Sequence, residues 1–208
     1  MIELFYYPTP NGRKISILLE ELELKYKITR IDITKNEQFS ENFLKISPLN
    51  KIPAIIDDQE TVFESGAILI YLAKKNNFKF YPQKYEKNIN EWLMVQVSFV
   101  GPMLGQLHYF YKFNKGKSEY AENRFSELAK KIYEYLDMQL SKNKYLACDE
   151  YTIADIATFP WLCRHEWHEI GIKKYKNLSR WYEEISKRPA VVKGYDPENL
   201  GEKIPLAS

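Results

Sequence analysis

Two adjacent segments, Asn50–Ile56 and Val62–Leu69, most strongly constrain how this chain can fold. The first is a short β-branched run opened by Pro53, and a proline at the start of a strand leaves the preceding residue, Ile52, extended. The backbone N–H and C=O of Ile52 can then pair with an extended peptide. In the second segment we predict Ser65 as a helix N-cap, followed by N–H groups suited to a carboxylate. Together the two segments predict a site for a small peptide with a free acid.

The first 78 residues predict a single α/β unit. Residues 2–7 are β-branched and aromatic, which is typical of a buried strand. Apolar residues at i, i+3, i+4 and i+7 from Ile15 to Leu22 then predict a helix that packs on the sheet. The other expected elements are a strand at 26–33, a short helix at 39–46, a hairpin of strands at 53–57 and 61–63, and a helix from 65 that ends before 76.

The strand signals stop at a linker, residues 76–86, and the remainder, 86–208, is predicted to be all helical. An apolar stripe from Phe125 to Leu140 indicates a long amphipathic helix. Pro102 lies within another long helical pattern and implies a kink. We expect residues 194–208 to form a loose tail.

A second helix start is marked by Thr152 and Asp155, which have the spacing of a capping box. Tyr151 and Ile156 occupy the hydrophobic staple positions around this box. We therefore interpret Asp155 as a structural residue and not as a catalytic one.

Composition excludes several classes of function. A net charge of +2, from 30 basic and 28 acidic residues, gives no basic surface for nucleic acid. No apolar run approaches the ~18 residues of a membrane span, and no secretory signal opens the chain. Cys148 and Cys163 form no CxxC pair, and His165 and His168 lack a third ligand. We expect a cytoplasmic protein with no metal, no nucleic-acid partner and no membrane partner.

The turn between the first strand and the first helix offers groups that favour an anion. It carries the Thr9 hydroxyl, the Asn11 side-chain amide and the positive end of the helix dipole. A thiol held there would be shifted toward the thiolate, which is the nucleophilic form. The turn has no cysteine, so we expect the chain to form no mixed disulfide there.

These segments resemble the glutathione transferase family. The sequences of residues 8–14, 47–55 and 101–106 are most similar to its bacterial nu class, whose relatives include a glutathione-transferase-like yeast regulator of nitrogen metabolism. The resemblance implies a thioredoxin-like α/β domain at 1–78 with a cis-proline at Pro53, followed by an all-α domain at 86–208. It also implies glutathione as co-substrate, a homodimer, and reduction of small disulfides.

The resemblance also implies roles for individual residues. Asn11 and Thr9 would face the sulfur of glutathione, and Ile52 would pair with its cysteinyl backbone. The other implied binding residues are Lys51 and Gln38 near the glycyl end, Glu64 and Ser65 at the γ-glutamyl group, and Arg124 from the helical domain.

Two alternatives to a disulfide reductase remain open. Tyr7 stands five residues before Gly12, in the register where tyrosine-type transferases keep their thiol-activating hydroxyl, so the enzyme could instead add glutathione to electrophiles. The fold could also serve as a regulatory module that binds glutathione without turnover. The aromatic run 107–113 either lines the second-substrate pocket or packs in the core and at a dimer contact.

Overall fold

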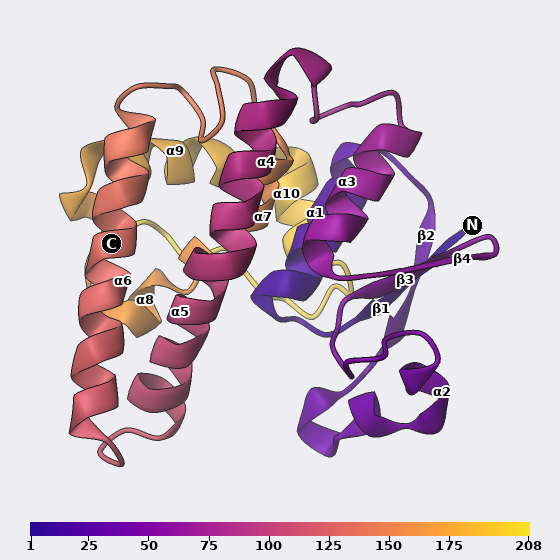
Figure 1. Ribbon diagram of the computed structural model, residues 1–208, viewed down its shortest axis with the longest axis horizontal. Coiled ribbons are helices and arrows are strands. Elements are labelled where there is room, and N and C mark those ends of the chain that lie inside the picture. Colours follow the sequence, from indigo (N-terminus) through magenta and orange to yellow (C-terminus); the bar gives the residue numbers. More distant parts are fainter.

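A four-stranded mixed sheet forms the first part of the molecule. The computed structural model describes residues 1–208, and Figure 1 shows this sheet beside a larger group of helices. The strand order is β2-β1-β3-β4, with β1 parallel to β2 and antiparallel to β3, and with β4 antiparallel to β3. The strands are β1 (Ile2–Tyr6), β2 (Tyr26–Arg30), β3 (Ala54–Asp57) and β4 (Glu60–Phe63). This is the thioredoxin-like arrangement that the family resemblance implied.

Three helices cover the two faces of the sheet: α1 (Pro10–Glu21), α2 (Glu41–Leu44) and α3 (Ser65–Lys75). In Figure 1, α1 and α3 lie between the sheet and the helical part. The opposite face carries a small separate cluster in which the rings of Phe5 and Phe43 lie 5.9 Å apart. Helix α2 is a single turn preceded by two 3₁₀ turns, so it is shorter than the predicted helix at 39–46.

The second part contains helices and no strands, as predicted. Its α-helices are α4 (Glu86–Val95), α5 (Gly101–Leu107), α6 (Glu119–Leu140), α7 (Ile153–Leu162), α8 (His165–His168), α9 (Lys176–Ser186) and α10 (Pro189–Tyr195). Two π-helical segments, Gln96–Val100 and His108–Phe113, flank α5. The 3₁₀ turns Gln83–Tyr85 and Ile172–Lys174 precede α4 and α9, and the two 3₁₀ turns of the α/β part are Ile33–Lys35 and Glu37–Phe39. Pro102 has no N–H and cannot donate the usual helical hydrogen bond. The long helix accommodates it through the π segment directly before Gly101 and Pro102, in which i→i+5 bonding replaces the α-helical pattern.

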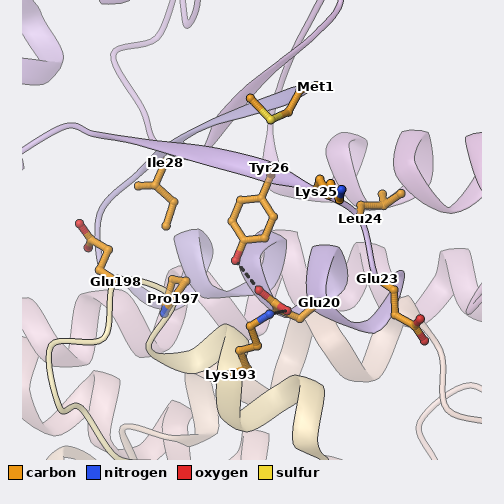
Figure 2. Close-up of a pocket in the computed structure, with 10 residues that line it drawn as sticks. All are labelled: Met1, Glu20, Glu23, Leu24, Lys25, Tyr26, Ile28, Lys193, Pro197 and Glu198. Atoms are coloured by element: carbon orange, nitrogen blue, oxygen red, sulfur yellow. Dashed lines mark hydrogen bonds and ion pairs between the residues drawn. The ribbon is translucent and has the colours of Figure 1, made fainter.

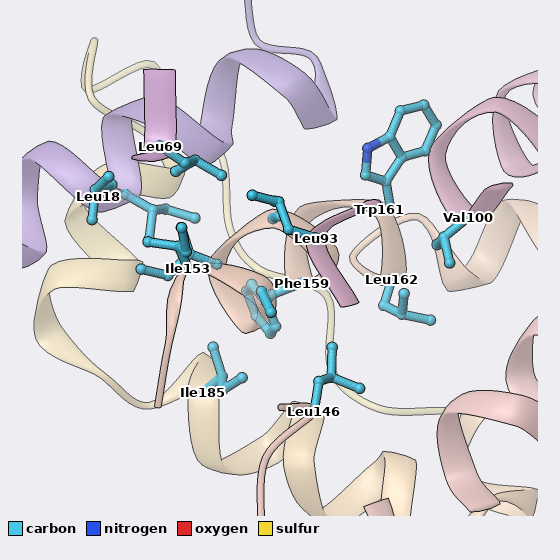
Figure 3. Close-up of a cluster of buried hydrophobic side chains, with 14 of the residues drawn as sticks. Leu18, Leu69, Leu93, Val100, Leu146, Ile153, Phe159, Trp161, Leu162 and Ile185 are labelled. Carbon is cyan, nitrogen blue, oxygen red and sulfur yellow. The ribbon is translucent and has the colours of Figure 1, made fainter. Parts of the chain in front are cut away.

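One hydrophobic core joins the two parts. It runs from the sheet through α1 and α3 into α4, α7 and α9, and Figure 3 shows Leu18 and Leu69 of the first part in one cluster with Leu93, Ile153 and Phe159 of the second. Helix α10 packs closely on α1: a Cβ added at Gly194 would lie 2.5 Å from the Cα of Ile17. Side chains of the helical part therefore bury much of the apolar surface of the α/β part.

The predicted capping box at the start of α7 is confirmed. Thr152 accepts a hydrogen bond from the N–H of Ala154, while the Asp155 carboxylate accepts one from the N–H of Thr152. Asp155 also accepts hydrogen bonds from the Trp181 indole at 2.8 Å and from the N–H of Leu146 at 3.0 Å. Its surroundings are those of a structural residue.

Two predicted features are wrong. Ser65 is the first residue of α3 and not its cap; the cap position belongs to Glu64, which has φ 68° and makes no side-chain capping bond. Residues 194–208 are not a loose tail, because Tyr182 donates a hydrogen bond to the carbonyl of Pro205 and the N–H of Lys173 donates one to the carbonyl of Ser208. Hydrogen bonds to residues far away in the sequence thus hold this C-terminal segment in place.

Candidate active site

The turn after β1 brings Thr9 to the start of α1. Thr9 is the N-cap, and its Oγ1 accepts a hydrogen bond from the N–H of Gly12 at 3.3 Å. Its hydroxyl hydrogen is therefore still able to donate to another group. Glycine is required at position 12, because a Cβ there would collide with the carbonyl oxygen of Tyr7. The absence of a side chain at Gly12 thus lets the first turn of α1 pack directly on the chain after β1.

Trp161, near the end of α7, orients the Asn11 amide. The indole N–H of Trp161 donates a hydrogen bond to Oδ1 of Asn11 at 3.2 Å. Because the oxygen is already paired, the Nδ2 donors of Asn11 are left to face a ligand. The sequence prediction did not include Trp161, which lies in a helix that is buried on every side.

The Ile52–Pro53 peptide bond is cis, as the family resemblance implied. Ser47 holds the residue before Ile52: its Oγ accepts from the N–H of Lys51 at 3.2 Å and donates to the carbonyl of Lys51 at 2.7 Å. The N–H and C=O of Ile52 pair with no other backbone group of the chain. They are the groups a bound peptide backbone would use.

A cavity of about 240 Å³ lies beside these groups. Two buried side-chain oxygens on its wall, Oε1 of Gln38 and Oδ1 of Asn50, have no hydrogen-bond partner in the chain. Buried polar atoms are normally paired, so unpaired acceptors at a cavity indicate a ligand with N–H donors. The lining residues are Thr9, Pro10, Asn11, Ile33, Gln38, Asn50, Lys51, Ile52 and Trp161.

A second cavity, of about 260 Å³, shares Asn11 and Trp161 with the first. At its wall Ser65 opens α3, and the exposed carboxylate of Glu64 stands next to it. It also includes residues of the helical part, so both parts of the chain build it. The lining residues are Asn11, Lys14, Glu64, Ser65, Gln96, Val97, Gly101, Pro102, Gly105, Gln106 and Trp161.

Three of the predicted site residues, Tyr7, Pro53 and Arg124, line neither of these cavities. The ring of Tyr7 packs beneath the Arg30 guanidinium, 4.9 Å from ring centre to guanidinium carbon, and lines neither cavity. Arg124 is exposed on α6 and also lines neither cavity. Seven predicted site residues line the two cavities: Thr9, Asn11, Gln38, Lys51, Ile52, Glu64 and Ser65. Pro53 is buried behind Ile52, to which its cis bond joins it, and Tyr7 and Arg124 lie outside.

Behind Trp161 lies a buried histidine pair. His108 stacks on the Trp161 ring, and its Nε2 lies 2.8 Å from Nε2 of His168, whose Nδ1 lies 2.7 Å from the Tyr133 hydroxyl. Burial lowers the pKa of His108 to about 4 and that of His168 well below its usual value. Both imidazoles are therefore neutral at pH 7, and the pair shares one N–H. No group of three or more His, Cys, Asp or Glu side chains in the chain is arranged to hold a metal ion.

Another hollow, of about 910 Å³, lies between β2, the end of α1 and α10. At its centre Glu20 accepts from the Tyr26 hydroxyl at 2.8 Å and from Lys193 at 2.7 Å, as Figure 2 shows. The charged side chains of Glu23 and Lys25 lie at its exposed rim. The two smaller cavities are the better candidate site.

Comparison with known proteins identifies the family. Residues 2–74 match the glutathione S-transferase N-terminal domain and residues 99–189 match the glutathione S-transferase C-terminal domain. The chain belongs to the glutathione S-transferase family. It is 38% identical over 211 residues to the disulfide-bond oxidoreductase YfcG of Escherichia coli, a match that covers 98% of each chain.

Solved structures agree with this assignment. A glutathione transferase of Burkholderia graminis with two glutathione molecules bound per subunit superposes with a TM-score of 0.90 at 38% identity, covering 96% of this chain and 89% of that one. A glutathione transferase of Pseudomonas putida with one glutathione disulfide bound per subunit gives 0.88 at 34%, covering 93% and 90%. No helix of the present chain is both long and apolar enough to cross a membrane.

Proposed function

We propose that this protein uses glutathione to reduce small or mixed disulfides. The observation that carries the proposal is the Asn11 amide, which lines both cavities and whose oxygen accepts from Trp161, so that its N–H donors remain available to a ligand. Similarity to proteins named disulfide-bond oxidoreductases supports the same activity. So does the glutathione disulfide bound to the Pseudomonas putida relative.

Glutathione would lie across both cavities. The γ-glutamyl group would bind at Glu64 and Ser65, where the first N–H groups of α3 favour its carboxylate. The cysteinyl backbone would pair with the N–H and C=O of Ile52, and the glycyl end would lie near Lys51 and Gln38. This pose places the sulfur near Asn11 and Thr9, whose free donors stabilise a thiolate.

The chemistry is thiol–disulfide exchange in two steps. The glutathione thiolate attacks one sulfur of the substrate, the substrate S–S bond breaks, and the second sulfur leaves as a thiolate that takes up a proton. A second glutathione then attacks the mixed disulfide, which yields glutathione disulfide and the other thiol. The enzyme contributes no cysteine, because Cys148 and Cys163 are buried and burial raises the pKa of both thiols.

Positioning would supply more acceleration than thiol activation. Lowering a thiol pKa from ~8.5 to ~6.5 raises the thiolate fraction at pH 7 from ~3% to ~75%, but the weaker nucleophile loses about eightfold in reactivity. The net gain is only a few-fold. Alignment of thiolate and disulfide in adjoining cavities is worth far more.

Turnover on two kinds of substrate tests the proposal. Glutathione is supplied with a small disulfide or, in parallel, with an aryl halide, for wild type, Tyr7→Phe and Asn11→Ala. We expect disulfide reduction that survives Tyr7→Phe and falls in Asn11→Ala. Dominant conjugation that is lost with Tyr7 would replace the proposal by a tyrosine-type transferase, and glutathione binding without turnover would indicate a binding module.

We also propose a homodimer, in which an apolar hollow of about 380 Å³ between α4 and α6 forms part of the interface. Around it Val95, Tyr135 and Met138 are 37%, 50% and 53% exposed. Such a cluster is more typical of a protein contact than of open surface. A cytoplasmic location is supported by the two unpaired cysteines.

A further inference from the structure

Lys14, on the second turn of α1, is almost fully buried at the wall of the Ser65 cavity. Only 1% of the residue is exposed. Its ammonium donates hydrogen bonds to Oε1 of Gln96 at 2.5 Å and to Oγ of Ser65 at 3.2 Å. Lys14 thus joins three segments that are far apart in the sequence.

This lysine has no carboxylate within ion-pair distance. Burial lowers its pKa to about 7, and the charge of Glu64 opposes that shift. A buried cation without a close counter-ion is costly. The cost is offset if an anion enters the adjoining cavity when the ligand binds.

The bond from Lys14 also sets the direction of the Ser65 hydroxyl. Because the lysine N–H donates to Oγ, the oxygen acts as acceptor there, and the Ser65 O–H must donate to a different atom. The chain provides no acceptor for that hydrogen among its hydrogen bonds, and Ser65 lines the cavity. A carboxylate oxygen in the cavity would fit this donor.

Gln96, from the π segment of the helical part, completes the arrangement. It is 1% exposed, and its Nε2 has no hydrogen-bond partner although it is buried. A Cβ at Gly101 would lie 2.9 Å from Nε2, so the glycine leaves room for this amide. The amide oxygen of Gln96 therefore accepts from Lys14, while its N–H donors stay unpaired at the cavity wall.

We propose that Lys14 is a positioning residue that makes this end of the site specific for an α-carboxylate, acting through Ser65 and held in place by Gln96. The inference rests on the proposed function, since the carboxylate is that of the γ-glutamyl group. Ser65 supplies the direct donor and Lys14 the positive charge behind it. A unit charge at a few ångströms in a partly buried site changes ligand affinity on the order of 10-fold or more.

Binding of two matched ligands tests the proposal. One is S-methylglutathione, which cannot react, and the other is S-methylated 4-aminobutyryl-cysteinyl-glycine, which lacks only the α-carboxylate. Dissociation constants are measured by calorimetry at pH 6.5 for wild type, Lys14→Met and the exposed control Lys74→Met. We expect Lys14→Met to weaken S-methylglutathione about 10-fold or more and the analogue less than 2-fold, with Lys74→Met unchanged for both.

Gln96→Glu serves as a second variant that creates no cavity. Its carboxylate would neutralise Lys14, so it should also weaken S-methylglutathione and leave the analogue unaffected. An equal loss for both ligands, or no loss in either variant, would overturn the role of Lys14. If the wild type itself did not bind S-methylglutathione, the proposed function would fail instead, so the two failures are distinguishable.

Discussion

The indole N–H of Trp161 donates a hydrogen bond to the Asn11 side-chain oxygen at 3.2 Å, which ties the helical part to the turn after β1. Trp161→Phe keeps a large ring and removes this donor, so the Asn11 amide is free to rotate. We predict that kcat/KM for disulfide reduction falls about 10-fold, the equivalent of ~1.4 kcal/mol. Steady-state kinetics with glutathione and a small disulfide provide the measurement.

The matched control for this change is Trp167→Phe, because Trp167 lies on α8 and lines neither the candidate cavities nor the hollow between α4 and α6. It should leave kcat/KM within about 2-fold. Equal losses in both variants would show that the effect comes from general loosening of the fold and not from Asn11.

Local patterns were enough to predict the elements around the site. The β-branched run after Pro53 forms β3, and Thr152 with Asp155 forms the predicted capping box. Thr9 was predicted for its hydroxyl, and its role as N-cap of α1 is equally local, since cap residues act on N–H groups only a few positions away. These features depend on neighbours in the sequence.

The missed features depend on contacts between distant residues. Trp161 meets Asn11 across 150 positions, and Gln96 meets Lys14 across 82. Lys14 occurs on a helix whose pattern places charged residues in water, and only the packing of the helical part shows that it is buried. Ser65 was misplaced by one residue because Glu64 adopts a positive φ that no residue type signals.

Binding of the γ-glutamyl carboxylate should be linked to proton uptake at Lys14. Burial lowers the pKa of Lys14 from 10.5 to about 7, and a bound carboxylate would raise it again. The charged form binds better, so affinity is greatest below pH 7 and falls as the pH rises above 7. Of the groups that face Lys14, Ser65 and Gln96 do not titrate, which leaves Glu64 as the nearby acid.

Calorimetry with S-methylglutathione at pH 7.5, in two buffers of different ionisation enthalpy, measures this linkage. We expect proton uptake in the wild type and none in Lys14→Met. Affinity that stays constant from pH 6 to 8.5 in the wild type would contradict the assignment of the charge to Lys14.

Asp155→Asn should destabilise the fold without changing glutathione binding. The carboxylate accepts hydrogen bonds from Trp181 and from two backbone N–H groups, and an amide NH₂ would face one of these donors. At pH 7 we predict a loss of about 2–4 kcal/mol in the free energy of unfolding, measured in urea. An unchanged KM in the folded protein would separate this residue from the site.

The same carboxyl also gives a pH dependence of stability. Burial raises the pKa of Asp155 to about 6, from 3.8. The folded state therefore holds a proton that the unfolded state releases between these values, and this contribution to stability is complete below about pH 4 and is lost as the pH rises to 6. The pH slope of stability in that window should be smaller in Asp155→Asn; an identical slope would assign it to other groups.

A charge in the hollow between α4 and α6 should separate the proposed dimer. Met138 is 53% exposed at its edge, and Met138→Glu would place a carboxylate in a surface that must lose its water when two copies meet. We expect a protein of twice the chain mass in sedimentation or light scattering, and a shift to the monomer in this variant. Tyr120→Glu is the matched control, since Tyr120 is 77% exposed on the first turn of the same helix and lies outside the hollow. A wild type that sediments as a monomer, or a control that dissociates as readily as Met138→Glu, would exclude this face as the interface.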